Sequence, residues 1–272
     1  MAVRDLMEPD SGAVTTAPPI IEVRNVGQVF KTTSKGEVTA LADVSLSIRE
    51  GEFVSVIGPS GCGKSTLMRI IAGLVQPTSG EVLVRGERVS GASKDVGIVF
   101  QQAALFPWRS VLKNVMLSAE MHGLPKAEAE SRAHDLLAMV NLSDAAHLYP
   151  YELSGGMQQR AGIARALLHD PAILMMDEPF GALDALTREN MGLELLKIWE
   201  QSRKSVVFIT HSVNEALFLS DRVLVMAARP GRVQELIEVK LRRPRDLDAM
   251  ATPEFGETAQ HLRHLLGART GD

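Results

Sequence analysis

Strand-like and helix-like segments alternate along most of the chain. Apolar and polar residues alternate over 20–26 and 38–48, which predicts two strands that each bury one face. Short apolar runs predict further strands at 53–58, 81–86, 97–102, 172–177, 205–210 and 221–226. Helical spacing predicts helices at 64–73, 186–204 and 213–219. Because helices separate successive strands, we expect an α/β fold with a mostly parallel sheet.

The segment 111–168 has a different character. Ala, Leu, Met, Glu and Lys dominate it at helix-like spacing, with breaks at 123–125 and 149–150. This pattern predicts a helical insertion between two strands of the sheet, spanning about 103–168.

The two ends of the chain differ from the region between them. Residues 1–19 lack periodicity and end in Pro-Pro, which predicts a disordered tail. The basic run 240–245 (KLRRPR) is interpreted as a solvated linker. Beyond it, Thr252-Pro253 is typical of a helix start, and a short amphipathic helix is predicted within the extension 241–272. Its apolar face is expected to carry Phe255, Ala259, Leu262 and Leu266.

Composition narrows the class of protein. The 272 residues are 45% hydrophobic and 23% charged, which is typical of a globular protein. The net charge of −4 favours neither nucleic acid nor anionic lipid as a partner. One cysteine excludes a disulfide framework and a Cys-based zinc site. His261 and His264 have no evident third ligand for a metal. No apolar run reaches the ~18 residues of a membrane span, and the acidic N-terminal segment is unlike a signal peptide.

A glycine-rich loop follows the strand at 53–58. It fits the pattern G-x-x-x-x-G-K-[ST] between a strand and a helix, the setting that a phosphate-binding loop needs. Its backbone N–H groups and the helix N-terminus favour anions, Lys64 would contact the β- and γ-phosphates, and the Ser65 hydroxyl would bind Mg²⁺. The predicted nucleotide-binding residues here are Gly58, Pro59, Ser60, Gly61, Cys62, Gly63, Lys64, Ser65 and Thr66. The Cys62 thiol, inside this loop, is expected to serve as a chemical probe of ATP binding.

A second acidic strand end completes this chemistry. Asp177 follows a run of apolar residues and would hold Mg²⁺ together with Ser65. Glu178 comes next and would deprotonate the attacking water.

The segment 153–160 (LSGGMQQR) precedes a helical run. Ser154 is a good N-cap and the two glycines permit close approach of a ligand, so this is a second helix start suited to phosphate. A single ATP has no evident use for two such phosphate-binding helix starts in one domain.

This segment resembles the signature motif of ATP-binding cassette (ABC) proteins, and the resemblance covers about 20–240. It implies that two copies stack head to tail and that Ser154, Gly155, Gly156 and Gln158 close over the ATP of the partner. Phe30 then matches the aromatic that stacks on adenine, and Asp184 lies in the D-loop at the dimer contact. Gln101 matches the glutamine that senses Mg²⁺ and water, and His211 the switch histidine that contacts the γ-phosphate.

The implied fold is a P-loop NTPase core with a mostly parallel sheet, an antiparallel β-subdomain and a helical insertion subdomain. The implied cofactors are ATP and Mg²⁺, and the catalytic residues are Glu178, His211 and Gln101. The run 105–115 (LFPWRSVLKNV) and the short extension resemble the nitrate, sulfonate and taurine group of importers. The chain would then be a peripheral ATPase on the cytoplasmic face of the membrane. Its partners would be permease subunits and, indirectly, an extracytoplasmic solute-binding protein.

Two alternatives stay open at this point. A soluble ABC ATPase of nucleic-acid or ribosome metabolism would also carry these motifs, although the charge and the lack of long insertions speak against it. A non-hydrolysing, ATP-gated binding module is another class, against which Glu178 and His211 speak. Likewise, Leu105, Phe106 and Trp108 either touch a permease or belong to the core of the helical insertion.

Overall fold

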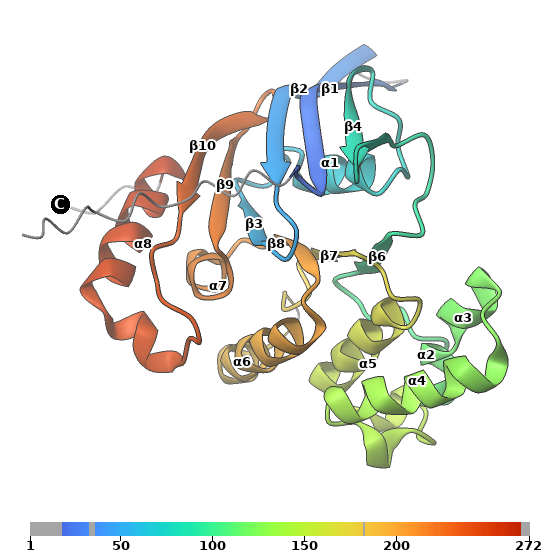
Figure 1. Cartoon of the computed structure of the whole chain (residues 1–272). Helices are drawn as coiled ribbons and strands as arrows, with labels where there is room; N and C mark the ends of the chain where they lie inside the picture. Colours follow the sequence, from blue (N-terminus) through green and yellow to red (C-terminus); the bar gives the residue numbers. More distant parts are fainter. Residues whose placement is uncertain (1–17, 33–35, 182, 268–272) are drawn as a thin grey trace, which may run out of the picture.

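A six-stranded sheet forms the centre of the computed structural model, which describes residues 18–32, 36–181 and 183–267 (Figure 1). Its strand order is β10-β9-β3-β8-β7-β6, and every neighbouring pair is parallel except β10 with β9. The strands are β3 (Phe53–Ile57), β6 (Val96–Val99), β7 (Ile173–Asp177), β8 (Ser205–Ile209), β9 (Arg222–Ala227) and β10 (Arg232–Glu238). The predicted mostly parallel sheet is therefore confirmed. The predicted N-terminal tail lies, up to residue 17, outside the described residues.

The central strands bring the candidate residues to one edge. All side chains of β3 and β8 are buried, as expected for strands covered on both faces. Because β3, β8 and β7 are adjacent and parallel, their carboxyl ends meet at the same edge of the sheet. The glycine-rich loop follows β3, Glu178 follows β7, and His211 follows β8 closely. This edge is where open α/β sheets bind ligands.

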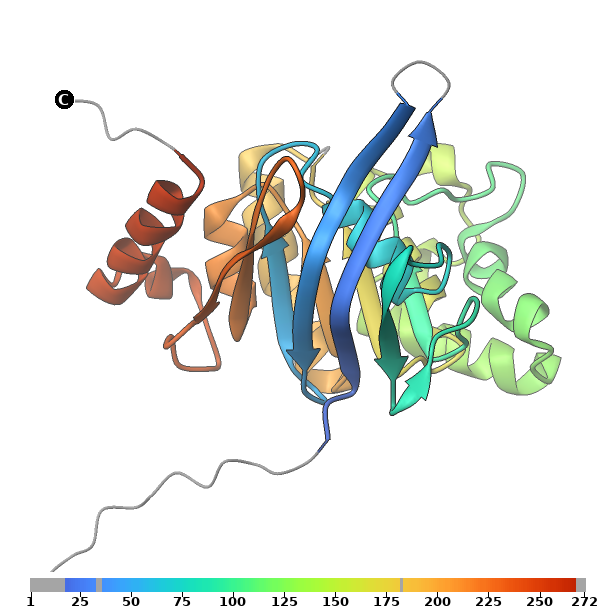
Figure 2. The same ribbon diagram turned by 90° about the horizontal axis from the view of Figure 1, so that it is seen from above.

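A second, antiparallel sheet has the order β2-β1-β4-β5. Its strands are β1 (Ile21–Thr32), β2 (Gly36–Ile48), β4 (Ser79–Val84) and β5 (Glu87–Arg88). Helix α1 (Lys64–Ile71) packs between the two sheets and contacts strands of both. The apolar residues around it form one of the two cores of the molecule. Figure 2 shows the long strands β1 and β2 side by side, in front of the strands of the central sheet.

A group of helices between β6 and β7 accounts for the predicted helical insertion, and it lies on one side of the central sheet (Figure 1). It comprises α2 (Val111–Val115), α3 (Leu117–His122), α4 (Lys126–Met139), α5 (Gly155–Leu167) and the short 3₁₀ turns η1 (Ser143–Ala145) and η2 (Pro150–Glu152). Its apolar side chains belong to the second core, which continues beneath the six-stranded sheet.

Helices α6 (Ala185–Ser202) and α7 (Val213–Leu219) lie below the sheet in Figure 1. The C-terminal extension forms η3 (Leu247–Ala251) and α8 (Pro253–Leu265), which pack against α7. Phe255, Ala259 and Leu262 of α8 are buried, and Leu266 packs partly against the same core, as the pattern predicts. None of the described helices combines the length and apolar character that a membrane span requires.

The interpretation of 240–245 as a solvated linker is wrong. Arg245 is only 6% exposed and donates to the carbonyls of Leu217, Phe218 and Ser220. The last carbonyls of a helix lack partners of their own, so the guanidinium fills that need at the end of α7. Burial lowers the pKa of Arg245 to about 10. Arg243 pairs with Asp221 at 2.8 Å in the same region. This basic run therefore fastens the extension to α7.

The two histidines of α8 form no metal site. His261 lies 3.0 Å from a carboxylate oxygen of Glu235 on β10. Among the described residues, no group of three or more metal-binding side chains lies close together.

Candidate functional site

The glycine-rich loop holds a buried ammonium group. The side chain of Lys64 is 6% exposed, and its Nζ donates to the carbonyls of Gly58 at 2.9 Å and Pro59 at 3.4 Å. Within the described ranges, Lys64 takes part in no ion pair, so its positive charge is available to an anion. Gly63 has a φ of +93° and a Cβ there would lie 2.5 Å from Leu41, so only glycine fits this tight curl.

A cavity of about 250 Å³ opens over this loop. It is lined by Ala40, Ser60, Gly61, Gly63, Lys64, Ser65, Thr66, Glu178 and His211. Apart from Ala40 of β2, the cavity thus joins residues that are far apart in sequence but follow three adjacent strands. Helix α1 begins at Lys64, so its first N–H groups and its positive dipole end face the same space. The arrangement suits a phosphate chain.

Asp177 and Ser65 form a pair of oxygen ligands beside the loop. The Ser65 hydroxyl donates to Asp177 Oδ1 at 3.2 Å. Burial raises the pKa of Asp177 above its usual value, although the hydrogen bond from Ser65 acts in the opposite direction. A half-buried carboxylate and a hydroxyl are hard oxygen donors of the kind that Mg²⁺ prefers, so the residues present fit this ion.

Glu178 and His211 face each other at the mouth of the cavity. His211 Nε2 lies 2.6 Å from Glu178 Oε1. Glu178 has a φ of +49°, a conformation that is uncommon outside glycine and that concentrates at functional sites. Its N–H donates to the Ile209 carbonyl at 2.9 Å, and its own carbonyl accepts from Gly181 N–H at 3.0 Å. The backbone therefore holds this carboxylate where it can accept a proton from a water molecule in the cavity.

Neither Gln101 nor Asp184 lines the phosphate cavity. Gln101 follows β6, and its amide nitrogen lies 2.9 Å from the place that a Cβ on Gly181 would occupy. Gln101 lines a neighbouring cavity of about 340 Å³ together with Gly155 and Gln158. Asp184 caps α6 by accepting from Thr187 N–H at 3.0 Å.

The structure does not bring the segment 154–158 to the phosphate cavity of its own chain. Ser154 is the N-cap of α5, as predicted, and accepts from Met157 N–H at 3.3 Å. The start of α5 lies well apart from α1 in Figure 1. Phe30, on β1, is 39% exposed and is also absent from the cavity lining.

The expectation that the Cys62 thiol is an accessible probe is wrong. The whole residue is buried in the core between the two sheets, and it does not line the phosphate cavity. Burial raises the pKa of the Cys62 thiol, which lowers the fraction of reactive thiolate.

Ellman's reagent is accordingly expected to react with the native protein at least about tenfold more slowly than with the urea-unfolded chain, because the reagent attacks the exposed thiolate. The absorbance of the released thiolate reports the rate. Equal rates for the two states would contradict the burial of Cys62.

The loop that precedes α2 presents an exposed aromatic residue. Trp108 is 71% exposed and stacks on Phe106 with ring centroids 5.1 Å apart, so assignment of Trp108 to the core is wrong. The buried Asn114 fixes this loop: it accepts from Phe106 N–H at 2.7 Å and donates to the Arg109 carbonyl at 2.9 Å. Leu105, by contrast, packs partly against the helical core.

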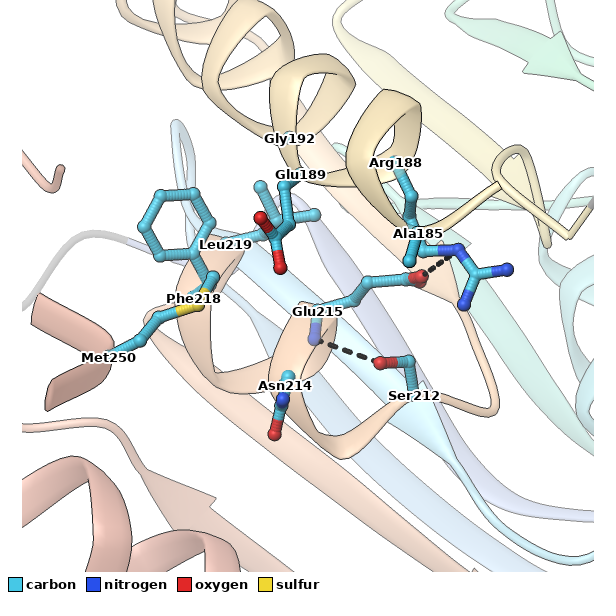
Figure 3. A pocket seen from close by; sticks show the side chains of 10 residues that line it. All are labelled: Ala185, Arg188, Glu189, Gly192, Ser212, Asn214, Glu215, Phe218, Leu219 and Met250. Carbon is cyan, nitrogen blue, oxygen red and sulfur yellow. Dashed lines mark hydrogen bonds and ion pairs between the residues drawn. The ribbon is translucent and has the colours of Figure 1, made fainter. Parts of the chain in front are cut away.

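Sequence reasoning missed three residues around His211. Thr210 is buried directly before it, and Glu215 contacts Thr210 from the first turn of α7. Arg188 of α6 lies 3.4 Å from Glu215 (Figure 3). The only signal in the sequence is an acidic residue on a short, mostly apolar helix, which is too common to single out.

Comparison with known proteins gives consistent results. Residues 41–181 match the family model described as ABC transporter. An uncharacterised ABC transporter ATP-binding protein of Methanocaldococcus jannaschii is 51% identical over 90% of this chain and 91% of its own length. A taurine import ATP-binding protein of Roseobacter denitrificans is 45% identical over 90% and 93%. A dimeric, post-hydrolysis ATP-binding cassette bound to ADP and Pi is 36% identical with a TM-score of 0.70, covering 81% of this chain and 99% of that one.

Proposed function

Because the chain belongs to the ABC transporter family and is an ATPase of that family, we propose that it powers a membrane importer of small solutes. The observation that carries its ATP-hydrolysing part is the cavity lined by Glu178 and His211, 2.6 Å apart, and by the buried Lys64, while the import role is supported by the similarity to a taurine import ATP-binding protein. A proton acceptor and a phosphate-binding ammonium group in one cavity are what hydrolysis of a phosphoanhydride requires.

The loop, the charged residues of the cavity and Phe30 outside it have proposed roles toward ATP. The loop 58–66 wraps the β- and γ-phosphates with its N–H groups, and Lys64 neutralises part of their charge. Glu178 takes the proton of the attacking water, while His211 holds the carboxylate in place and contacts the γ-phosphate. Phe30 stacks on the adenine from β1.

Ser65, Asp177 and Gln101 are proposed to hold Mg²⁺, directly or through its water shell. When bound, the ion neutralises charge that develops on the phosphate oxygens. Gln101 lies close enough to Gly181 to follow movements of the turn after Glu178.

The proposed active unit is a head-to-tail pair of chains. The start of α5 offers N–H groups for a phosphate, yet it lies apart from the cavity of its own chain (Figure 1). In the pair, Ser154, Gly155, Gly156 and Gln158 close over the ATP of the partner copy, with Asp184 at the contact. ATP would then join the two chains because it binds the closed pair better than the open one.

Trp108 and Phe106 are proposed to contact the permease. A stacked pair of aromatic rings, one of them largely exposed and held by a buried asparagine, is typical of an interface anchor. Beside it lies a cavity of about 440 Å³ lined by Trp108, Arg109, Leu112, Lys113, Met116 and Glu120, among others. The chain would sit on the cytoplasmic face of the membrane, and a solute-binding protein would act on the far side. The resemblance favours nitrate, sulfonates or taurine as solutes.

Copurification tests the importer proposal. A tagged chain expressed in membranes of its source is expected to retain an integral-membrane partner, and Trp108→Glu is expected to reduce that retention at least about tenfold, since a charge would be buried at the contact. Leu74→Glu, at a residue that is 51% exposed on another surface, is the matched control. ATP hydrolysis without any retained membrane protein would instead favour a soluble ABC ATPase.

A further inference from the structure

Glu215 is bonded to the residues on both sides of His211. It contacts the Thr210 hydroxyl, which accepts from Ser212 N–H at 3.0 Å. Ser212 in turn accepts from Glu215 N–H at 3.3 Å as the cap of α7 (Figure 3). The residues before and after His211 are thus both bonded to Glu215, Thr210 to its carboxylate and Ser212 to its backbone N–H, and the Glu215 side chain is 13% exposed.

Arg188 connects this arrangement to the turn that follows Glu178. Its Nε lies 3.4 Å from Glu215 Oε1, and its Nη2 donates to the Leu183 carbonyl at 3.0 Å. Leu183 N–H donates to the Phe180 carbonyl, two residues beyond Glu178. A path of contacts therefore leaves Glu178 along the backbone and returns through Arg188, Glu215 and His211.

The charges around Glu215 depend on Arg188. Burial raises the pKa of Glu215, and its bond to Thr210 and the charge of Arg188 lower it. The charge of Glu178 also raises the pKa of Glu215 and His211 lowers it, both more weakly. Loss of Arg188 would leave a buried carboxylate without its main cation.

The pair is poorly suited to a purely stabilising role. Its ion pair is long, and it borders a cavity of about 180 Å³ that is also lined by Phe218 of α7 and Met250 of η3 (Figure 3). Because Arg188 is 35% exposed and the contact is long, the intact pair adds little net stability to the fold, although removal of one partner leaves the other charge uncompensated. The pair nevertheless joins α6, which follows the turn after Glu178, to α7, which follows His211.

We propose that the Arg188–Glu215 pair is a positioning element that couples Leu183 and Asp184, at the start of α6, to His211. When a partner chain contacts Asp184, the displacement of α6 would reach His211 through this pair and align it with Glu178. This rests on the proposed roles of Glu178, His211 and Asp184.

The test separates turnover from binding. Arg188→Gln and Glu215→Gln are each expected to lower kcat about 10- to 100-fold, because a misplaced catalytic group loses rate steeply. The KM for ATP and the Kd of the monomer for ATP should stay within about twofold, since neither residue lines the phosphate cavity. The double variant should be no slower than either single one, because both changes break the same connection. Arg188→Lys keeps the charge and should recover part of kcat.

Arg243→Gln is the matched control. Arg243 also makes an ion pair, with Asp221, and a bond to a backbone carbonyl, that of Leu219, and its guanidinium lies 4.1 Å from the ring centroid of Trp199, but it is at the far end of α7. It should lower Tm and leave kcat unchanged. The coupling would be overturned if Glu215→Gln left kcat unchanged. It would also be overturned if kcat, ATP binding and Tm all fell together, as they do in a folding defect. Should Arg188→Gln fail to fold, the nearly isosteric Glu215→Gln decides. If Glu178→Gln keeps full activity, the proposed function fails instead.

Discussion

Glu178→Gln is expected to lower steady-state ATP hydrolysis about 10²- to 10⁴-fold, the range of a lost general base. The amide fills the same space but cannot take the proton of the attacking water. ATP binding should persist, because Lys64 and the glycine-rich loop are unchanged. ATP that binds but is not cleaved should hold two chains together, so a dimer is expected on size-exclusion chromatography with ATP and Mg²⁺. Phosphate release and elution volume measure the two effects.

Glu257→Gln serves as the control for removal of a glutamate charge, since Glu257 is exposed on α8. It should leave turnover and the elution volume unchanged. Hydrolysis by Glu178→Gln at the rate of the unaltered protein would refute the role of this carboxylate. Loss of ATP binding in this variant would show that Glu178 shapes the cavity rather than the chemistry.

Local patterns predicted the framework of the site because each of its parts is short and continuous. The run 53–58, the glycine-rich loop and the helix after it are consecutive, so their geometry follows from backbone preferences. Asp177 and Glu178 follow an apolar strand in the same way. A mostly parallel sheet then brings the strand ends together, as found for β3, β7 and β8.

The sequence could not predict contacts that depend on packing between distant segments. The run 240–245 looked solvated because its charges have no local partner, yet Arg245 meets carbonyls at the end of α7. The buried position of Cys62 depends on the antiparallel sheet, which covers the loop from the other side. The pair Arg188–Glu215 joins two helices separated by β8, and no spacing rule relates them.

Ser154→Arg is expected to abolish hydrolysis while the monomer binds ATP normally. Ser154 does not line the phosphate cavity of its own chain, so binding should stay within about twofold. The large cation would block closure of α5 over the ATP of the partner chain. Loss of the cap on α5 alone costs about 1 kcal/mol. Thr252→Arg, which removes the equivalent cap of α8, controls for that loss and should retain turnover.

Combining the two inactive variants distinguishes a site shared between chains from one within a chain. In a heterodimer of Glu178→Gln and Ser154→Arg, one of the two composite sites has an intact Glu178 from one chain and an intact Ser154 from the other. Such heterodimers, isolated with two different affinity tags, should therefore recover up to about half of the activity of the unaltered pair if the two sites act independently. A site contained within each chain would leave both halves inactive. Complete inactivity of folded, ATP-binding heterodimers would thus reject the head-to-tail arrangement with independent sites. Recovered activity, by contrast, could not arise from a site contained within one chain.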